Sequence, residues 1–361
     1  MKISTKVFTE NQNLFNSILN SQNQFFKSIC LDFTNKLAYS FNNTDNLRVK
    51  FEYELNDKEE VPKPLFIDGK LFTNLCKLTN DISYDDSKNL FSIGKDTYKI
   101  PFFRQDEYDF IEFDDIEIIS TIKVNLNKDL SSLIKTASQF MCQTAYSSKE
   151  KSLNGIFIRN NRCIASDTKK FVNLSLPVKI DDLDINSNVL KFLVQLEDKE
   201  VTISKNENIV KMSFDSIDLI IVNSELQLPP IEKEGFISSY EHNNKVIVNK
   251  NELLSELLFL EDFLRESGSE KLYIIIRKEN ILLQVKENTK DIYVDKEFVF
   301  KTIQTEQDEV EFPLNVAYLK MALSSINSET IDVRFDDEKI GIKLSANNEP
   351  SDSFVVLIKM I

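Results

Sequence analysis

Very few residues of this 361-residue chain have the types and spacing that enzyme catalysis requires. The one histidine, His242, lies in a polar stretch without a partner placed to make it a general base, so we interpret it as a solvated side chain. The sequence has no GxxxxGKS/T, GxGxxG or GxSxG pattern, and its six glycines are too few to favour a phosphate-binding loop. We therefore predict no catalytic residues.

Acidic residues form the densest clusters that would suit a metal ion. Asp106–Asp109 and Glu112–Asp115 lie close together in the sequence, and Asp85 and Asp86 form a third cluster. None has the D-x-D-x-D-G spacing of a calcium loop, so we interpret them as solvated acidic loops. Four widely spaced cysteines form no zinc pattern and are interpreted as reduced core residues: Cys30, Cys76, Cys142 and Cys163. We predict no metal and no cofactor.

The composition is typical of a soluble protein with two or three domains. Hydrophobic residues make up 42% of the chain, which is enough for packed cores. No apolar run reaches the roughly 18 residues that span a bilayer, and the first residues lack the apolar region of a secretory signal. We therefore expect a cytoplasmic protein that has no membrane partner. The net charge of −14 opposes nucleic-acid binding unless a local basic face overcomes it.

The elements that would position functional residues recur at a nearly constant interval. Candidate helices begin 58 to 65 residues apart, near Asn11, Gly69, Asn127, Asn186, Asn251 and Asn315. Their apolar residues follow the i, i+3, i+4, i+7 spacing of amphipathic helices. Examples are Leu71, Phe72, Leu75 and Leu78, and Leu130, Leu133, Ile134 and Ala137. The helix from Asn251 is predicted to end at Ser267.

Each candidate helix follows a short strand-like run. These runs are Ile3–Phe8, Leu65–Ile67, Ile122–Leu126, Val178–Ile180, Val246–Val248 and Val310–Phe312. Segments after the helices alternate apolar and polar residues, as Ile331–Phe335 does. The repeated unit is therefore a strand, a helix and about three strands, and two units make a domain of about 120 residues. This predicts an α+β protein with domains at 1–120, 121–240 and 241–361.

The segment from Val124 to Leu176 resembles the middle domain of the bacterial DNA polymerase III beta subunits, the beta sliding clamps. Leu153-Asn154-Gly155 corresponds to the Leu-Asn-Gly strand start of that family, and Ala165-Ser166-Asp167-Thr168-Lys169-Lys170-Phe171 to its Ala-Thr-Asp-Gly-His-Arg-Leu segment. The end of the chain, 354–361, is similar to the family's Tyr-Val-Val-Met-Pro-Met-Arg-Leu. The resemblance follows the order of the whole chain but is weak in the first domain. The divergence and the composition suggest a bacteriophage member.

The resemblance implies three tandem clamp domains, each made of two βαβββ units. Two chains would close head-to-tail into a homodimer ring with helices inside and sheets outside. Such a ring encircles double-stranded DNA through contacts to phosphate that read no sequence. It implies a processivity factor with no enzymatic activity, whose partners are DNA polymerase and a clamp loader. It would act in the cytoplasm of a bacterium or an infected bacterial host.

The resemblance also implies three sets of site residues. A pocket for a partner peptide with Leu and Phe anchors would contain Leu153, Ser166, Thr168, Phe171, Pro229, Tyr318, Gly341, Val355 and Leu357. Candidate DNA contacts are Lys70, Lys77, Lys128, Lys135, Lys149, Lys151 and Lys320, although each also fits an ordinary solvated lysine. The subunit contact would use Phe263 and Leu264, near the end of an acidic helix.

Two other interpretations stay open at this point. The first is a clamp-like scaffold that does not close into a ring and acts in replication or transcription. Loading onto DNA by a clamp loader would separate it from a sliding clamp. The second is an enzyme of unfamiliar α+β fold with an acidic metal site, which thermal stabilisation by a metal ion would reveal.

Overall fold

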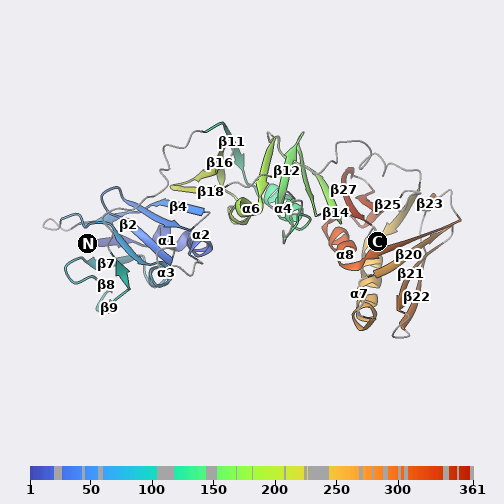
Figure 1. The fold of residues 1–361 in the computed structure, drawn as a ribbon, viewed down its shortest axis with the longest axis horizontal. Coiled ribbons are helices and arrows are strands. Elements are labelled where there is room, and N and C mark those ends of the chain that lie inside the picture. The colour runs from blue at the N-terminus through green and yellow to red at the C-terminus, as the bar shows by residue number, and fades with distance from the viewer. Residues whose placement is uncertain are drawn as a thin grey trace. The chain divides into compact units, whose positions relative to one another are not determined.

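A computed structural model describes most of the chain and packs it as two compact units (Figure 1). The described residues are 1–19, 27–42, 45–55, 60–103, 118–143, 153–167, 169–180, 182–206, 209–222, 226, 244–267, 271–278, 280–287, 292–299, 302–304, 308–335, 341–347 and 349–357. Unit 1 comprises Met1–Lys128 with Lys191–Ser224, and unit 2 comprises Asp129–Leu190 with Glu225–Ile361. The predicted middle domain, 121–240, is thus divided between the units, and the three-domain division stays a prediction. His242 and the acidic clusters at 106–115 lie outside the described residues.

Unit 1 contains two antiparallel sheets. One has the strand order β5 (Tyr53–Glu54), β1 (Lys2–Ser4), β7 (Asp81–Asp85), β8 (Leu90–Ile93), β9 (Asp96–Tyr98). The other has the order β10 (Phe102–Phe103), β6 (Leu65–Asp68), β2 (Ser28–Asp32), β3 (Leu37–Phe41), β4 (Asp45–Lys50), β18 (Ile217–Val222), β17 (Ile209–Phe214), β16 (Glu200–Lys205), β11 (Ser120–Asn125). Its helices are α1 (Lys6–Glu10), α2 (Gln12–Ile18) and α3 (Gly69–Cys76). The β4–β18 pair joins the first repeat to the fourth.

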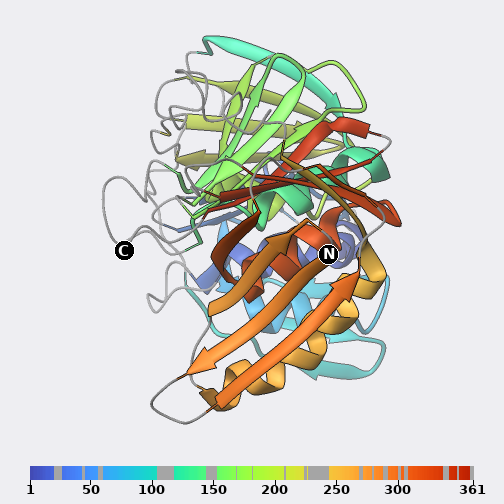
Figure 2. The ribbon, with the colours of Figure 1, turned by 90° about the vertical axis from the view of Figure 1, so that its right-hand side faces the viewer.

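Unit 2 also contains two antiparallel sheets. The larger has the order β15 (Leu183–Asn186), β12 (Gly155–Arg159), β13 (Arg162–Ser166), β14 (Lys170–Ser175), β27 (Glu349–Leu357), β26 (Gly341–Ala346), β25 (Thr330–Phe335), β19 (Lys245–Asn249), β23 (Thr302–Gln304). The smaller has the order β22 (Ile292–Val299), β21 (Asn280–Glu287), β20 (Lys271–Arg277), β24 (Glu309–Asn315). Helix α7 (Lys250–Ser267) lies along one face of the smaller sheet (Figure 2), and α8 (Val316–Ser325) packs on β24 and β27.

Two helices cross a boundary between the units in the sequence. Helix α4 (Lys128–Ser138) starts at the last residue of the first segment of unit 1, and α6 (Ser187–Leu193) ends just inside the second segment. No described helix is both long and apolar enough to cross a membrane.

The predicted helix starts are confirmed because short polar side chains cap the first turns. Helix α3 begins at Gly69, and the other later helices begin within one residue of the predicted positions. Asp68 accepts a hydrogen bond from the Leu71 amide, and Asn315 accepts from the Ala317 and Tyr318 amides. Asn186 and Asn249 likewise accept from the amides three residues further on. Such caps satisfy amides that have no partner within the helix.

Three expectations about local structure were wrong. The first strand stops at Ser4, and Phe8 lies in α1 with its ring packed on Phe15, Phe51 and Phe72. No strand covers Val178–Ile180, which follows Pro177, a residue with no amide hydrogen to donate; β15 begins three residues later. Leu71 and Leu78, assigned to an inward stripe, are 48% and 65% exposed. Their exposure leaves an apolar strip on the surface of α3 and of the turn that follows it, which we call the strip on α3.

An ion pair crosses the seam between β4 and β18. Arg48 and Asp218 are direct partners in the register, and the Arg48 guanidinium donates to Asp218 Oδ2 from Nη2 at 2.7 Å and from Nε at 3.1 Å. The two side chains are 16% and 24% exposed, so water screens the pair only partly. The seam is therefore held by side-chain charge as well as by backbone hydrogen bonds.

We expect Asp218→Asn to lower the free energy of unfolding by about 2 kcal/mol, because it removes the negative charge from an oxygen that accepts two hydrogen bonds from Arg48 in a sparsely hydrated site. Urea denaturation followed by circular dichroism measures this. The matched control is Asp215→Asn, three residues away, whose pair with Lys199 is about half exposed and should change stability by less than about 0.5 kcal/mol. Equal effects of the two variants would contradict the role of the seam pair.

Candidate functional site

Most of the predicted partner-pocket residues gather at one corner of the large sheet of unit 2. Ser166 pairs with Phe171, Phe171 pairs with Val355, and Gly341 pairs with Leu357, so β13, β14, β27 and β26 each contribute one or two of them. Leu153 precedes β12, and its carbonyl accepts from the Cys142 amide beyond the end of α4. Thr168 and Pro229 lie outside the described residues, and only the backbone of Val355 and Leu357 is described.

Lys170 is a nearly buried cation at this corner that the sequence did not identify as a site residue. Only 4% of its side chain is exposed. Its ammonium lies 2.9 Å from Asp167 Oδ2 and donates to the Gln139 carbonyl at 2.8 Å, just beyond α4. The ring centroids of Phe140 and Tyr318 lie 5.9 Å and 5.4 Å from the same nitrogen, within the range of cation–π attraction. One side chain therefore ties the β13–β14 hairpin to the ends of α4 and α8.

The predicted pocket residues do not all project from one face of the sheet. Successive residues of a strand point to opposite faces, so Lys170 and Phe171 project in opposite directions. Tyr318, beside Lys170, lies on the face that the helices cover, whereas Phe171 lies on the other face. Leu153 and Phe171 are 5% and 1% exposed, so neither offers an open apolar surface in this structure. The pocket stays a prediction, and its apolar members are packed.

The described lysines that were predicted to contact DNA fall into two groups. Lys70 and Lys77, at the two ends of α3, and Lys128 and Lys135, on α4, are exposed. Both pairs are seven residues apart, which places each pair on one side of its helix about 10 Å apart along the axis. Lys320 of α8 differs, because its ammonium pairs with Glu261 of α7 at 2.5 Å. Lys149 and Lys151 lie outside the described residues.

The outer surface of α7 combines apolar and acidic side chains. Leu258 and Phe259 are 55% and 52% exposed, whereas Leu264, predicted to form the subunit contact, is 3% exposed. Phe263 is half-buried, and its ring lies 5.4 Å from that of Phe259. Four exposed acids surround this apolar surface on the same helix: Glu252, Glu261, Asp262 and Glu266. The exposed apolar residues are thus one turn earlier than the sequence indicated.

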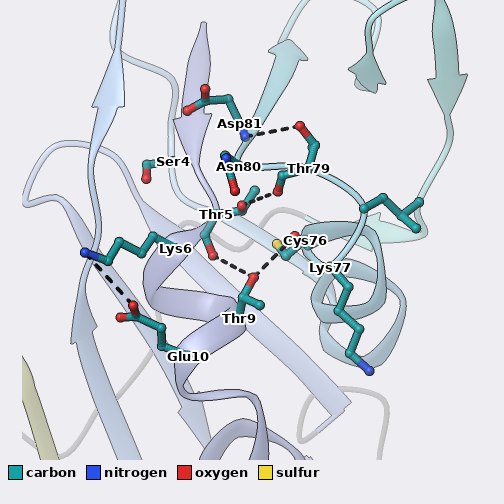
Figure 3. Close-up of a pocket in the computed structure, with 11 residues that line it drawn as sticks. Ser4, Thr5, Lys6, Thr9, Glu10, Cys76, Lys77, Thr79, Asn80 and Asp81 are labelled. Atoms are coloured by element: carbon teal, nitrogen blue, oxygen red, sulfur yellow. Dashed lines mark hydrogen bonds and ion pairs between the residues drawn. The ribbon is translucent and has the colours of Figure 1, made fainter.

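Unit 1 contains an open groove of about 800 Å³ between α1, the end of α3 and the start of β7 (Figure 3). Its hydroxyl groups are engaged locally: Thr5 donates to the Thr79 carbonyl, and Thr9 lies within hydrogen-bonding distance of the Thr5 and Cys76 carbonyls. Burial raises the pKa of the Cys76 thiol to about 12, so it stays protonated and is a poor nucleophile at neutral pH. Thr5, Thr9 and Cys76 therefore supply no activated nucleophile to the groove.

The described residues hold no metal-binding cluster of three or more His, Cys, Asp or Glu side chains. All four cysteines are buried and reduced, and burial also raises the pKa of the Cys163 thiol to about 12.

We expect Lys170→Met to lower the free energy of unfolding by about 2 kcal/mol, because it leaves the carboxylate of Asp167 without its cation in a poorly hydrated place. Thermal denaturation followed by circular dichroism measures the loss. The adjacent and exposed Lys169 supplies the matched control, and Lys169→Met should change stability by less than about 0.5 kcal/mol. If Lys170→Met melts at the same temperature as the wild type, the Lys170 cation does not stabilise the fold.

Comparison with known proteins identifies the fold. No family model and no curated protein matches the sequence. Solved structures that match include the DNA polymerase III beta chain from Streptococcus pneumoniae, with a TM-score of 0.79 and 15% identity over 100% of this chain and 99% of that chain. The DNA polymerase III subunit beta from Pseudomonas aeruginosa matches with a TM-score of 0.76 and 15% identity over 100% of both chains. The beta subunit from Thermotoga maritima gives 0.75 and 15% over 100% and 99%. The chain has the α+β fold of the DNA polymerase III beta subunits.

Proposed function

We propose that this protein is a DNA sliding clamp, a ring that encircles duplex DNA and tethers DNA polymerase, and that it is not an enzyme. The observation that carries the proposal is the full-length match to beta subunits, whose solved structures include one described as a DNA polymerase sliding clamp. The acidic net charge is compatible with this role, because a ring retained by topology needs only weak contacts to phosphate. A clamp loader would place it on DNA in the cytoplasm.

Two dissimilar surface strips support assembly as a head-to-tail dimer. The strip on α3 combines the exposed Leu71 and Leu78 with Lys70 and Lys77, and the strip on α7 combines Leu258 and Phe259 with acidic side chains. Apolar residues of one strip would pack on those of the other while the charges attract. A contact between two different strips, one on each copy, is heterologous. Heterologous contacts form a closed ring when the rotation that relates successive subunits returns to the first subunit. We therefore assign Lys70 and Lys77 to the subunit contact in place of DNA.

The edge strand β22 is a second surface that the proposed dimer would cover. It is eight residues long and forms the border of the smaller sheet of unit 2, with Tyr293 62% exposed. Long edge strands with apolar side chains promote aggregation unless they are covered. A second copy that covers β22 would remove this liability, and its strip on α3 would meet α7, which packs on the same sheet.

DNA contact is assigned to α4, which carries two exposed lysines and a single acidic residue, Asp129. On α4, Lys128 and Lys135 project two turns apart, which suits contact with phosphates along one strand. The acidic residues of α7 would repel phosphate, and Lys320 is neutralised by Glu261. Helix α4 is therefore the best candidate for the DNA-facing surface.

We expect the wild-type chain to form a dimer of about 84 kDa, twice its 41.8 kDa, in size-exclusion chromatography with light scattering. Leu71→Asp and Phe259→Asp should each give monomers, because a buried carboxylate opposes each contact. Mixing the two monomeric variants should restore a dimer, since one contact between unmodified strips is then available. Val61→Asp, at another exposed apolar residue of unit 1, should stay dimeric.

Other masses would contradict parts of this assembly. A trimer would contradict three domains per chain, because six domains complete the proposed ring. A monomeric wild type would favour the alternative, a clamp-like scaffold that does not close. Failure of the mixed variants to associate would point to like-with-like contacts rather than a head-to-tail ring.

We expect the protein, once a bacterial clamp loader has placed it on a nicked circular plasmid, to stay bound in 0.5 M NaCl and to dissociate when the plasmid is linearised. Topological linkage predicts both results, whereas binding through charge alone predicts loss in high salt. Co-migration of labelled protein with DNA in gel filtration measures retention. The double change Lys128→Ala and Lys135→Ala should lower direct affinity for linear duplex and reduce its salt slope by about 1.8, whereas Lys169→Ala should do neither.

A further inference from the structure

The ends of α4 and α8 meet at two corners over the seam between β14 and β27. At one corner, Lys170 of β14 contacts Gln139, just beyond the end of α4, and Tyr318, near the start of α8. At the other corner, the first turn of α4 and the last residues of α8 line a cavity of about 240 Å³, together with residues of β14, β26 and β27. The two corners therefore combine opposite ends of the same two helices.

The Lys170 corner shows what kind of group such a place accommodates. The Lys170 side chain is 4% exposed, and its ammonium pairs with Asp167 and donates to the Gln139 carbonyl. The rings of Phe140 and Tyr318 lie beside the same nitrogen. A chain of methylene groups that ends in an ammonium is thus stable between these helix ends when a carboxylate and a carbonyl face its charge.

The cavity at the other corner has apolar walls. Leu174, Ile326 and Phe354 line it, and each is no more than 4% exposed. The ring of Phe354 lies 5.6 Å from the ring of Phe140, so an aromatic contact connects the cavity to the Lys170 corner. The volume is below the roughly 300 to 1,000 Å³ that is typical of sites for drug-sized ligands, so the cavity suits a smaller molecule.

Two carboxylates give the cavity a negative charge. Asp129 and Asp352 both line it, and none of the described residues that line it is a lysine, arginine or histidine. Asp352 Oδ1 accepts from the Ser175 amide at 2.7 Å, and strand alternation places the Asp352 side chain on the same face as Phe354. Asp129 is exposed and also offsets the dipole of α4, because it lies in the first turn of that helix. Asp352 is therefore the stronger of the two groups for a cation.

Two cations of the protein act near this corner without lining the cavity. The charge of Arg162 acts on Asp352, but its guanidinium donates to the Ser175 hydroxyl and the Asn173 carbonyl. Lys250 donates to the Ile326 carbonyl at 2.8 Å. The second contact shows that the carboxyl end of α8, where the helix dipole is negative, accepts an ammonium.

We propose that this cavity binds a linear aliphatic diamine. Its methylene chain would pack on Leu174, Ile326 and Phe354, and its two ammonium groups would pair with Asp352 and Asp129. The paired carboxylates favour a dication over a monocation. The apolar walls favour methylene groups over Mg²⁺, which retains several of its waters and prefers a shell of oxygen ligands. The site lies outside the proposed clamp function and does not depend on it.

Isothermal titration calorimetry of the full chain in 50 mM NaCl tests the proposal with three probes of similar length. These are 1,4-diaminobutane, n-butylamine and 1,4-butanediol. We expect the diamine to bind and n-butylamine to bind about tenfold more weakly, because the monoamine forms one charge-assisted contact fewer. The uncharged diol should give no measurable heat of binding, because it has no charge to pair with the carboxylates.

The variant Asp352→Asn should raise the Kd of the diamine about tenfold, and Asp129→Asn should raise it about threefold, because Asp129 is more exposed to water. Asparagine at position 352 keeps an oxygen that can accept from the Ser175 amide, so we expect the fold to stay intact. Asp182→Asn is the matched control, because Asp182 belongs to the same unit, is 62% exposed and does not line the cavity. It should leave the Kd unchanged.

Each contrary outcome overturns a definite part of the proposal. If the diamine does not bind the wild type, the site is overturned. An equal rise in Kd for all three variants would mean that the diamine binds the acidic surface as a whole. Equal Kd values for the diamine and n-butylamine would overturn the assignment of a dication. If MgCl2 displaces the diamine at equal concentration, the cavity is a site for inorganic cations and the proposal fails. Should Asp352→Asn melt far below the wild type, Asp129→Asn alone decides.

Discussion

Backbone pairing across the β4–β18 and β14–β27 seams is the constraint on which the rest of the structure depends. Each seam joins strands that are distant in the sequence, and each makes one continuous sheet out of strands from several repeats. Because side chains alternate between faces, the register at a seam decides which residues meet the helices. A slip of one residue at β14 would turn Val172 away from the helix layer and Lys170 away from Gln139. The seam thus positions both the core and the candidate sites.

That register separates two kinds of surface in unit 2. The helix side holds the Lys170 cation and buried apolar residues such as Val172 and Phe354, and the opposite side holds Phe171. A net charge of −14 therefore says little about any one face. The exposed lysines on α4 are a local exception to the acidic composition, and local charge determines which partner a surface attracts. The proposed contact with DNA needs no basic protein.

The sequence predicted the helices better than the sites, for physical reasons. Helix starts follow from local signals, an amphipathic stripe after an Asn or Asp cap, and these agree with the structure from α3 onward. Phe8 was misassigned because an apolar residue in a short segment suits a strand or a helix equally. The resemblance placed Lys170 in a segment of the partner pocket but did not indicate that it is buried. Its burial depends on contacts with Gln139 and Tyr318, and the spacing of apolar residues does not predict contacts between such distant segments. Which residues of neighbouring strands share a face was not predicted, because strand alternation assigns faces within a strand and not partners between strands.

Surface composition distinguishes the proposed subunit contact from the cores that surround it. The strips on α3 and α7 each have two exposed apolar side chains and several charges, whereas the inner sides of the same helices bury Phe72 and Leu257 completely. A contact of this kind can break without exposing a core, because the apolar area it releases is small and the charges regain water. A ring must open at its subunit contacts to admit DNA while its domains stay folded. Strips that combine apolar and charged residues, and that lie outside the cores, allow the contact to open while the domains stay folded. A large apolar interface would not.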